Sequence, residues 1–580
     1  MSPSSTFGIN EGTRARALEA MTSQELDILV VGAGIVGTGA ALDAATRGLN
    51  VGLLEARDFA SGTSGLSSKL VHGGIRYLEQ LNFGLVREAL GERGLLLQDI
   101  APHLVTPIRF LYPVNHHVWE RAYIGAGMLL YDGMSYLGGR LPGVPHHRHL
   151  SKRQVMLAAP GLAEHATVGG MTYYDGHVDD ARYTATLART AAHYGAHVAT
   201  RTFVQDLLRD GDRVIGVRAR DNMTGEIFEV RAKQVVVAAG VWTNALQTLI
   251  GDPETFEVRM SKGVHILVEK DKFHSLMGLL LRTEKSVLFV IPWGRFWIIG
   301  TTDTAWTLDA AHPVATRADI DYILGHINKV VATPITHDDV VGVYAGLRPL
   351  LAGDSDETSK LSREHIVANP APGVTIVAGG KWTTYRVMAK DAVDAAVATF
   401  PAGAAEHVAE SVTAKVSLLG GDGYAAAVNR SAEWARRTGL SNYQVTRLLG
   451  RYGTDIETVV EMIEAEPALS TCLPGTKDYR EVEVVFAARH EMALHLDDVL
   501  MRRTRLVFES RDRAIQAAER TATLMAAELG WNAARVASEI AEYTARATAE
   551  LAAEQTTNDV EAEAAWHQVA DTAVGKDGFA

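Results

Sequence analysis

The stretch between residues 26 and 55 constrains the fold of this chain more than any other. It opens with an apolar run, residues 26–31, of the kind that a fully buried parallel strand needs. The sequence Gly-Ala-Gly-Ile-Val-Gly follows at residues 32–37, and a helical pattern runs from about residue 35 to residue 47. Residues 51–54 supply a second apolar strand, and Glu55 comes directly after it. Strand, glycines, helix, strand and acid in this order predict a βαβ unit that binds a dinucleotide.

Each glycine of this unit has its own task. Gly32 permits the tight turn after the strand, Gly34 lets a pyrophosphate approach the backbone, and Gly37 lets the helix pack closely on its strand. The first N–H groups of the helix then point at the phosphates. Glu55 stands where a carboxylate would bind both ribose hydroxyls and repel a 2′-phosphate.

The identity of the dinucleotide depends on the rest of the chain. An enzyme that uses NAD beside a flavin usually carries a second GxGxxG unit, and this sequence has none, since residues 125–127 lack the third glycine. A single nucleotide site near the N-terminus is more typical of an FAD protein whose electrons leave by a route other than NAD.

Length and composition set further limits. A chain of 580 residues should form two or three domains. Its net charge of −13 argues against general nucleic-acid binding, although it leaves room for a local basic pocket. The single cysteine, Cys472, excludes internal disulfides and cysteine zinc sites, suits a reducing cytoplasm, and lies far from the nucleotide unit. Residues 1–24 lack the apolar core of a signal peptide, so we expect a disordered leader. No window is long and apolar enough for a transmembrane helix.

A loop rich in serine and glycine, residues 60–78, follows the βαβ unit. Its backbone and hydroxyl donors suit the edges of a large flat ligand, and the alternative is a surface linker. A linker would not normally hold His72, Arg76 and Tyr77 within six residues, so the sequence favours a site. Further along, residues 235–242 read as a buried strand that closes on small residues beside the first βαβ unit. Residues 374–378 read as a last buried strand that feeds Gly379-Gly380 and a helix from about residue 383 to residue 396.

Several longer runs carry a resemblance to a known family. These are Ser-Ser-Lys-Leu-Val-His-Gly-Gly-Ile-Arg-Tyr-Leu-Glu at residues 67–79, Tyr-Ala-Gly-Leu-Arg-Pro-Leu at 344–350, and Gly-Gly-Lys-Trp-Thr-Thr-Tyr-Arg at 379–386, with shorter matches at 292–293 and 298–303. They resemble the aerobic FAD-dependent glycerol-3-phosphate dehydrogenases, within the D-amino-acid-oxidase-like flavoproteins, from about residue 25 to residue 400 and more loosely into the C-terminal helices.

The resemblance implies a fold that is α/β, or α+β overall. A Rossmann-like FAD-binding domain would cover residues 25–415, with a β-rich substrate-binding domain inserted at about 100–175 and 260–348. An all-helical domain would cover residues 416–556, and a disordered tail residues 557–580.

The resemblance also implies chemistry and site residues. Hydride would pass from sn-glycerol 3-phosphate to flavin N5, giving dihydroxyacetone phosphate, and the electrons would pass to a membrane quinone. His265, then His72, would be the proton acceptor, and Arg348 and Lys381 would act beside it. The residues expected to bind substrate are Arg76, Tyr77, Arg348, Lys381 and Arg363. Those expected to contact FAD are Gly32, Gly34, Gly37, Glu55, Thr63, Ser64, Ser67, Ser68, Val204, Ala239, Gly240, Gly379, Gly380, Lys381 and Thr383.

Alternatives and partners complete the expectations. A soluble oxidase of the same fold, which would return electrons to oxygen and make peroxide, is the first alternative. A flavin carrier without turnover is the second, and the cationic set Arg76, Arg348 and Lys381 argues against it. Residues 109–140 would lie on the inner face of the cell membrane or form an ordinary helix over the sheet. We expect no metal site, since the acids at residues 175–180 read as caps and turn residues. A homodimer is a further expectation.

Overall fold

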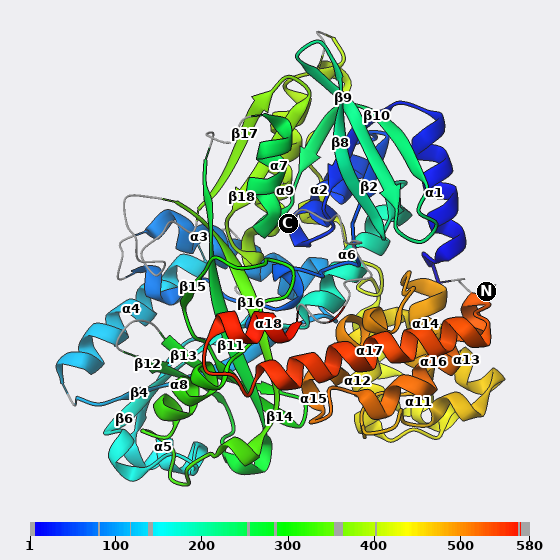
Figure 1. Cartoon of the computed structure of the whole chain (residues 1–580). Helices are drawn as coiled ribbons and strands as arrows, with labels where there is room; N and C mark the ends of the chain where they lie inside the picture. Colours follow the sequence, from blue (N-terminus) through cyan, green and yellow to red (C-terminus); the bar gives the residue numbers. More distant parts are fainter. Residues whose placement is uncertain are drawn as a thin grey trace.

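Three regions make up the molecule (Figure 1). The structure is a computed structural model that describes residues 6–78, 82–116, 118–136, 143–251, 256–283, 287–352, 364–400, 403–566 and 569, without the side chain of Arg76. Among these residues, one sheet of eight strands and one of ten lie side by side, and a helical C-terminal region packs against both. The expected mixed α/β fold, with a Rossmann-like part, a β-rich part and a helical part, is confirmed.

The eight-stranded sheet carries the predicted βαβ unit. Its main order is β17-β18-β10-β1-β2-β7, and the strands from β18 to β7 run parallel. The strands are β1 (Leu26–Val31), β2 (Val51–Leu54), β7 (His197–Ala199), β8 (Thr202–Asp210), β9 (Arg213–Asp221), β10 (Ile227–Val237), β17 (His365–Ala371) and β18 (Val374–Gly379). Helix α2 (Ile35–Thr46) contacts α6 (Asp180–His193) and α9 (Tyr385–Val397). The predicted first strand, helix and second strand are therefore present with nearly the predicted bounds.

The ten-stranded sheet supplies the opposite wall of the site. It contains β3 (Leu70–Val71), β4 (Val105–Val114), β5 (Arg148–Ser151), β6 (Gly169–Val178), β11 (Val258–Glu269), β12 (Gly278–Arg282), β13 (Val287–Trp293), β14 (Phe296–Gly300), β15 (Thr304–Trp306) and β16 (Val340–Leu351). Strands β11 and β16 are long antiparallel neighbours whose register sets His265 opposite Tyr344 and Ser261 opposite Arg348. Two runs distant in sequence thereby meet at one place.

Helices cover the sheets and form the C-terminal region. Besides α1 (Glu11–Ser23), α2, α6 and α9, those described before residue 400 are α3 (Phe83–Leu95), α4 (Trp119–Ser135), α5 (Lys152–Ala158), α7 (Thr243–Ile250) and α8 (Arg317–Ile327). The C-terminal set is α10 (Tyr424–Asn429), α11 (Ser431–Thr438), α12 (Asn442–Tyr452), α13 (Ile456–Ala465), α14 (Glu481–His490), α15 (Leu506–Glu509), α16 (Ile515–Leu529) and α17 (Ala533–Ala553). The last two cover the alanine-rich amphipathic stretches of the sequence.

The chain ends are more ordered than expected. The expectation of a disordered leader over residues 1–24 is wrong for most of its length, because residues 11–23 form α1 (Glu11–Ser23) with Asn10 as its cap. Arg14 pairs with Asp221 at 2.6 Å, and Met21 is fully buried. The sequence of this helix has low hydrophobicity, and the helix packs on β7 and β10 from another part of the chain, so its own residues do not predict it.

The tail expected to be disordered from residue 557 contains α18 (Asp559–Trp566). The Trp566 ring stacks on His312 at 4.4 Å, Asp559 pairs with Lys262, and Glu563 accepts a hydrogen bond from the Asp309 N–H at 2.7 Å. In Figure 1 this red helix lies across the front, beside β11 and β16. Residues 567, 568 and 570–580 lie outside the described residues.

Two smaller expectations also need correction. Residues 109–114 belong to strand β4 rather than to a helix, and among the described residues from 109 to 136 the helical part is α4. Asp175 is a strand residue of β6 that accepts from Tyr131 and Arg93, whereas Asp179 caps α6 as expected. Within the described ranges, no helix is both long enough and apolar enough to cross a bilayer.

Candidate functional site

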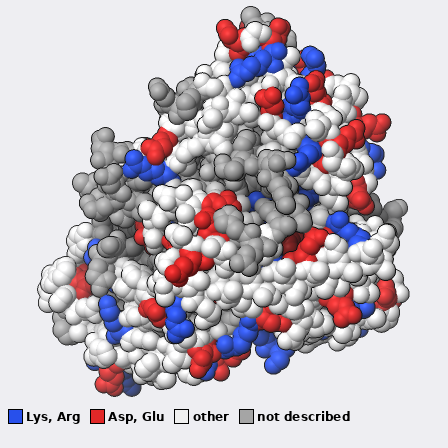
Figure 2. All heavy atoms as spheres, viewed as in Figure 1, with Lys and Arg blue, Asp and Glu red and all other residues white. Residues whose placement is uncertain are grey.

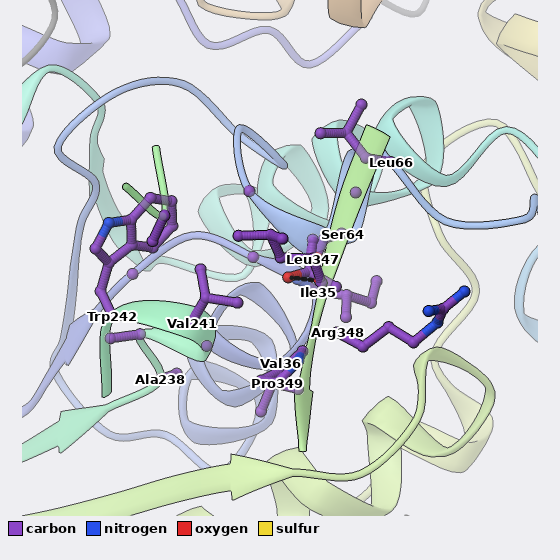
Figure 3. A pocket seen from close by; sticks show the side chains of 18 of the residues that line it. Ile35, Val36, Ser64, Leu66, Ala238, Val241, Trp242, Leu347, Arg348 and Pro349 are labelled. Carbon is purple, nitrogen blue, oxygen red and sulfur yellow. Dashed lines mark hydrogen bonds between the residues drawn. The ribbon is translucent and has the colours of Figure 1, made fainter. Parts of the chain in front are cut away.

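A cavity of about 1060 Å³ lies between the two sheets. It extends from Trp242 and Val241 on one side to Arg348 on the other, with Ile35, Ser64 and Leu347 between them (Figure 3). The parts of the chain that line it are the glycine turn, the loop at residues 61–68, the end of β10, strands β11 and β16, and the turn after β18. Of the site residues predicted from the sequence whose side chains the structure describes, all but Gly37 line this one cavity.

The nucleotide end is built from backbone groups. Gly32 has φ +102°, and a Cβ there would lie 2.7 Å from the carbonyl oxygen of Ala238. Gly37 does not line the cavity, because its Cα faces the Gly32 carbonyl oxygen, and an added Cβ would lie 1.8 Å from that oxygen. Gly34 caps α2 without a side-chain hydrogen bond, unlike the capped helices α1 and α6. The Ile35 N–H already donates to the Ser64 hydroxyl, so the N–H groups after it in the first turn of α2 are the ones that could meet an anion, as a pyrophosphate site requires.

Glu55 closes the glycine turn. Its carboxylate accepts hydrogen bonds from the N–H groups of Ala33, at 2.7 Å, and Arg57, at 2.8 Å. Burial raises its pKa above the ordinary value for glutamate, and the two N–H groups oppose that shift. Glu55 thus joins the turn to the second strand from inside the protein while it lines the cavity.

The hydroxyl groups of the serine-rich loop bind the elements that surround the loop. The Ser64 oxygen accepts from the Ile35 N–H at 2.9 Å (Figure 3), and the Thr63 hydroxyl donates to the carbonyl of Leu347 at 2.7 Å. Ser67 donates to Asp180, and the Ser68 hydroxyl meets His265 Nε2 at 2.8 Å. The sequence predicted that these residues lie at the ligand site, and they line the cavity. The composition of the loop did not predict which protein groups they bind.

Backbone turns complete the wall on which a flavin would rest. Ala239, Gly240 and Val204 line the cavity near Trp242. Gly379 and Gly380, with φ +74° and +77°, line its other side, and a Cβ on Gly380 would meet the Met388 sulfur at 2.4 Å. The cavity volume, the uncapped helix end and this glycine-rich wall fit FAD.

The opposite end of the cavity, where the sequence predicts catalysis and which is called the catalytic end below, is centred on His265 of β11. Its ring stacks on Tyr344 of β16 at 4.7 Å with an interplanar angle of 11°, and it is 2% exposed. Burial, and then the charges of Arg348 and Lys69, hold the pKa of His265 well below its usual value, so the ring is neutral at pH 7. Nδ1 is buried without a hydrogen-bond partner among the described residues.

Arg348 is held in a fixed orientation by its neighbours. Its guanidinium donates to the Thr301 hydroxyl at 3.0 Å and the Thr302 carbonyl at 3.2 Å, and it pairs with Asp303 at 3.6 Å. The side chain is 22% exposed and reaches the cavity. The run at residues 298–303 that carried part of the resemblance therefore orients this arginine.

Lys381, Tyr77 and His72 form the third group at this end. The Lys381 ammonium lies 3.6 Å from the centre of the Tyr77 ring, a cation–π contact. Thr383 connects this turn to the loop of His72, since its hydroxyl lies 3.1 Å from the His72 N–H and 3.2 Å from the His72 carbonyl oxygen. The side chain of Arg76 and all of Arg363 lie outside the described residues, so their predicted roles stay predictions.

Some residues of the site were missed by the sequence analysis. Tyr344, Ser261 and Trp242 contact or line the site, and Tyr344 stood inside a quoted run without a role. The strand register that pairs β11 with β16 is the signal that could have placed Tyr344 beside His265. No group of three or more side chains suited to a metal ion is found among the described residues.

Comparison with known proteins places these features in a family. Residues 27–386 match the model for FAD dependent oxidoreductases, and residues 411–536 match the C-terminal domain of alpha-glycerophosphate oxidase. The chain is 54% identical over 550 residues to glycerol-3-phosphate dehydrogenase 2 of Mycobacterium tuberculosis (strain H37Rv), covering 95% of this chain and 93% of that relative. It is 35% identical over 543 residues to the human mitochondrial glycerol-3-phosphate dehydrogenase, covering 89% and 72%. The crystal structure of the Bacillus halodurans glycerol-3-phosphate dehydrogenase with FAD aligns with a TM-score of 0.74 and 28% identity, covering 93% and 97%.

Proposed function

The chain belongs to the FAD-dependent glycerol-3-phosphate dehydrogenase family, and on that premise we propose that it oxidises sn-glycerol 3-phosphate to dihydroxyacetone phosphate. The observation that carries this proposal is the meeting of a neutral buried histidine with two cationic side chains at one end of a cavity that fits FAD. FAD, when bound there, would supply the two-electron acceptor for the hydride of the substrate carbinol.

His265 is the proposed proton acceptor for the substrate hydroxyl. A base must be unprotonated before it can act, and the lowered pKa of His265 keeps the ring neutral well below pH 6.5. Ser68 and the Tyr344 ring fix the plane of the imidazole. His72 lines the same cavity and is the second candidate.

Arg348 and Lys381 are the proposed groups for the substrate anion and for the negative charge that develops on the alcohol oxygen. The planar fork of Arg348 suits a phosphate or an alkoxide, and its contacts with residues 301–303 fix its direction. Tyr77 holds Lys381 at its ring face. Arg76 and Arg363 remain proposed contributors to phosphate binding.

We propose that the electrons pass to a quinone while the protein rests on the inner face of the cell membrane. Helix α4 supports this proposal, because its side chains Trp119, Tyr123 and Leu129 are 61%, 53% and 67% exposed. Exposed aromatic and leucine side chains on a helix suit the interface of a bilayer. Over the face shown in Figure 2, charges of both signs are interspersed.

An anaerobic titration with glycerol 3-phosphate tests the reaction. We expect the visible absorbance of the bound flavin to bleach, and a quinone analogue to restore it faster than oxygen does. Rapid recovery in oxygen with peroxide formation would favour the oxidase, in keeping with the match of residues 411–536 to an oxidase domain. A bound flavin that does not bleach would overturn the substrate assignment.

Flotation with anionic vesicles tests the membrane proposal separately. The double change Trp119→Glu and Leu129→Glu should abolish flotation while flavin bleaching persists. Leu157→Glu is a matched control, since Leu157 is 72% exposed on α5, outside α4. Flotation that survives the double change would contradict a role for α4.

A further inference from the structure

One segment of the helical C-terminal region reaches the back of the catalytic end. A π-helical turn, Asp498–Arg503, leads through Thr504 and Arg505 into the short helix α15. Arg505 has φ +133°, a backbone conformation that a residue with a side chain rarely adopts, and its side chain is 1% exposed. A buried arginine on a strained backbone needs strong compensating contacts.

Those contacts lie on the FAD-binding side of the molecule. The Arg505 guanidinium donates to Asp179 at 2.9 Å, to Asp180, and to the carbonyl of Gly65 at 3.0 Å. Gly65 begins the loop that carries Ser67 and Ser68. The arginine therefore binds both the start of α6 and the start of this loop.

Asp180 passes the contact on to the loop. Its carboxylate is fully buried and accepts from the Ser67 N–H at 2.9 Å, the Ser67 hydroxyl at 2.7 Å and the Lys69 ammonium at 2.7 Å. Lys69 itself has φ +61°, and its ammonium also donates to the Gly65 carbonyl at 2.7 Å. One carboxylate thus fixes both sides of Ser68.

Ser68 and its neighbours meet the catalytic histidine. The Ser68 hydroxyl lies 2.8 Å from His265 Nε2, and the Tyr344 hydroxyl donates to the Ser67 carbonyl at 3.0 Å. The Tyr344 ring stacks on His265 and also packs on Phe508 of α15, at 4.9 Å between ring centres. The C-terminal segment therefore supports His265 by two routes, through Asp180 and through Phe508.

We propose that Arg505 is a positioning residue, which acts through Asp180 and the loop at residues 65–69 to hold Ser68 against His265. Without Arg505, the ion pairs found here would leave the fully buried Asp180 with Lys69 and the 13% exposed Asp179 with Arg451 at 3.4 Å. The two carboxylates would then draw in water or other donors, and the loop would lose its fixed geometry. The helical domain would then serve the reaction as well as the fold. The kinetic part of this inference rests on the proposed oxidation of glycerol 3-phosphate.

A purely structural role for Arg505 makes a different prediction, and Arg503 supplies the comparison. Arg503 ends the π-helical turn, two residues before Arg505, and is equally buried. It pairs with Asp58 at 2.7 and 2.8 Å, and the contacts found for it do not include residues 65–69. Arg503→Gln should therefore weaken the same domain junction without changing the loop. Arg489→Gln, which removes an exposed pair with Glu528, is the surface control.

The test uses FAD-loaded protein and two readouts. We expect Arg505→Gln to bind FAD and to slow anaerobic flavin reduction by glycerol 3-phosphate about 10-fold to 100-fold, the effect of a small misplacement of a reacting group. Hydrogen exchange of peptides that cover residues 65–72 should quicken in this variant, and Arg505→Lys should restore part of both properties. Arg503→Gln should lower the melting temperature and leave both properties as in the wild type.

A normal reduction rate or normal exchange in Arg505→Gln overturns the proposal, as does an equal change in Arg503→Gln. If Arg505→Gln does not fold, Phe508→Leu tests the second route, and slower flavin reduction with retained FAD is expected. If glycerol 3-phosphate fails to bleach the wild-type flavin, the substrate assignment is wrong, while the exchange experiment still tests the loop.

Discussion

The two ends of the cavity are built in opposite ways. The nucleotide end comes from one continuous stretch, residues 26–64, and it faces the ligand with backbone N–H groups and with glycines that have no side chain. The catalytic end takes its side chains from the loop at residues 68–77, from β11 and β16, and from the turn after β18, which are distant in sequence. At the first end an added carbon atom should be intolerable, whereas at the second the identity of a side chain should govern the rate. The comparison predicts that changes at the two ends affect different measurements.

The largest effect is expected at Gly37. In Gly37→Val the Cβ would lie 1.8 Å from the carbonyl oxygen of Gly32, and a backbone atom cannot move aside as a flexible side chain does. Overpacking of this kind costs about 1–3 kcal/mol or more, here at the turn that holds the pyrophosphate. We expect protein without flavin, measured by the ratio of visible to ultraviolet absorbance.

Gly91→Ala is the control for this change. Gly91 lies inside α3, and an added Cβ would meet nothing within 4 Å. Replacing a helical glycine by alanine should stabilise the protein by about 0.5–1 kcal/mol and leave the flavin content unchanged. A Gly37→Val protein with full flavin would contradict the account of the nucleotide end.

The next effect is expected at His265. His265→Ala should keep FAD but lower the rate of flavin reduction by about 10²-fold to 10⁴-fold, the contribution of a positioned general base. Since the lowered pKa keeps His265 neutral, loss of activity on the acid side should begin well below pH 6.5 in the wild type. Stopped-flow absorbance across pH measures both.

Two other histidine variants sharpen this result. In His274→Ala, at an exposed position shortly after β11, the flavin should be reduced at the normal rate. His72→Ala should be slower than the wild type but faster than His265→Ala. The reverse order would make His72 the base, and a near-normal rate in His265→Ala would remove His265 from the mechanism.

A smaller effect is expected for Arg348→Lys. Lysine keeps the positive charge but cannot donate at the same time to Thr301, Thr302 and the substrate. Loss of one charge-assisted hydrogen bond should lower kcat/KM by about 10-fold to 100-fold. Arg282→Lys, at an exposed position of β12, is the control and should leave kcat/KM unchanged. An Arg348→Lys enzyme with unchanged kcat/KM would separate this arginine from substrate binding.

The same contrast explains what could be predicted from sequence. The unit at residues 26–55 was predictable because its requirements are local, so that strand, glycines and helix each appear in order. The catalytic end depends on the pairing of β11 with β16, and the sequence of neither strand predicts which strand it pairs with. His265 and Arg348 were therefore predicted only from the resemblance to a family. The two chain ends were mispredicted for a related reason, because α1 and α18 are fixed by partners such as Asp221 and His312 from other parts of the chain.

The smallest effect on flavin binding and on the reaction is expected behind the catalytic end, at Glu509 of α15. Its Oε1 accepts hydrogen bonds from the Trp293 ring N–H at 2.7 Å and from the Tyr479 hydroxyl at 2.9 Å. Burial raises the pKa of Glu509 to about 7, from 4.5 for an ordinary glutamate. Because the folded-state pKa lies above the unfolded one, the contribution of this carboxyl to stability is full below pH 4.5. It falls as the pH rises and is lost above pH 7.

Glu509→Gln tests this dependence, because glutamine keeps an oxygen for both donors but does not ionise. The free energy of unfolding of the variant, measured relative to that of the wild type, should increase from pH 5 to pH 8 by at most about 3 kcal/mol. Chemical unfolding at the two pH values measures this gain, with Glu457→Gln, at a 44% exposed side chain, as control. Flavin content should stay constant, because Glu509 does not line the cavity. If the stability of the variant and of the wild type depends on pH in the same way, Glu509 ionises as it would in water. The region behind Tyr344, where Phe508 packs and Trp293 donates to Glu509, would then be open to water.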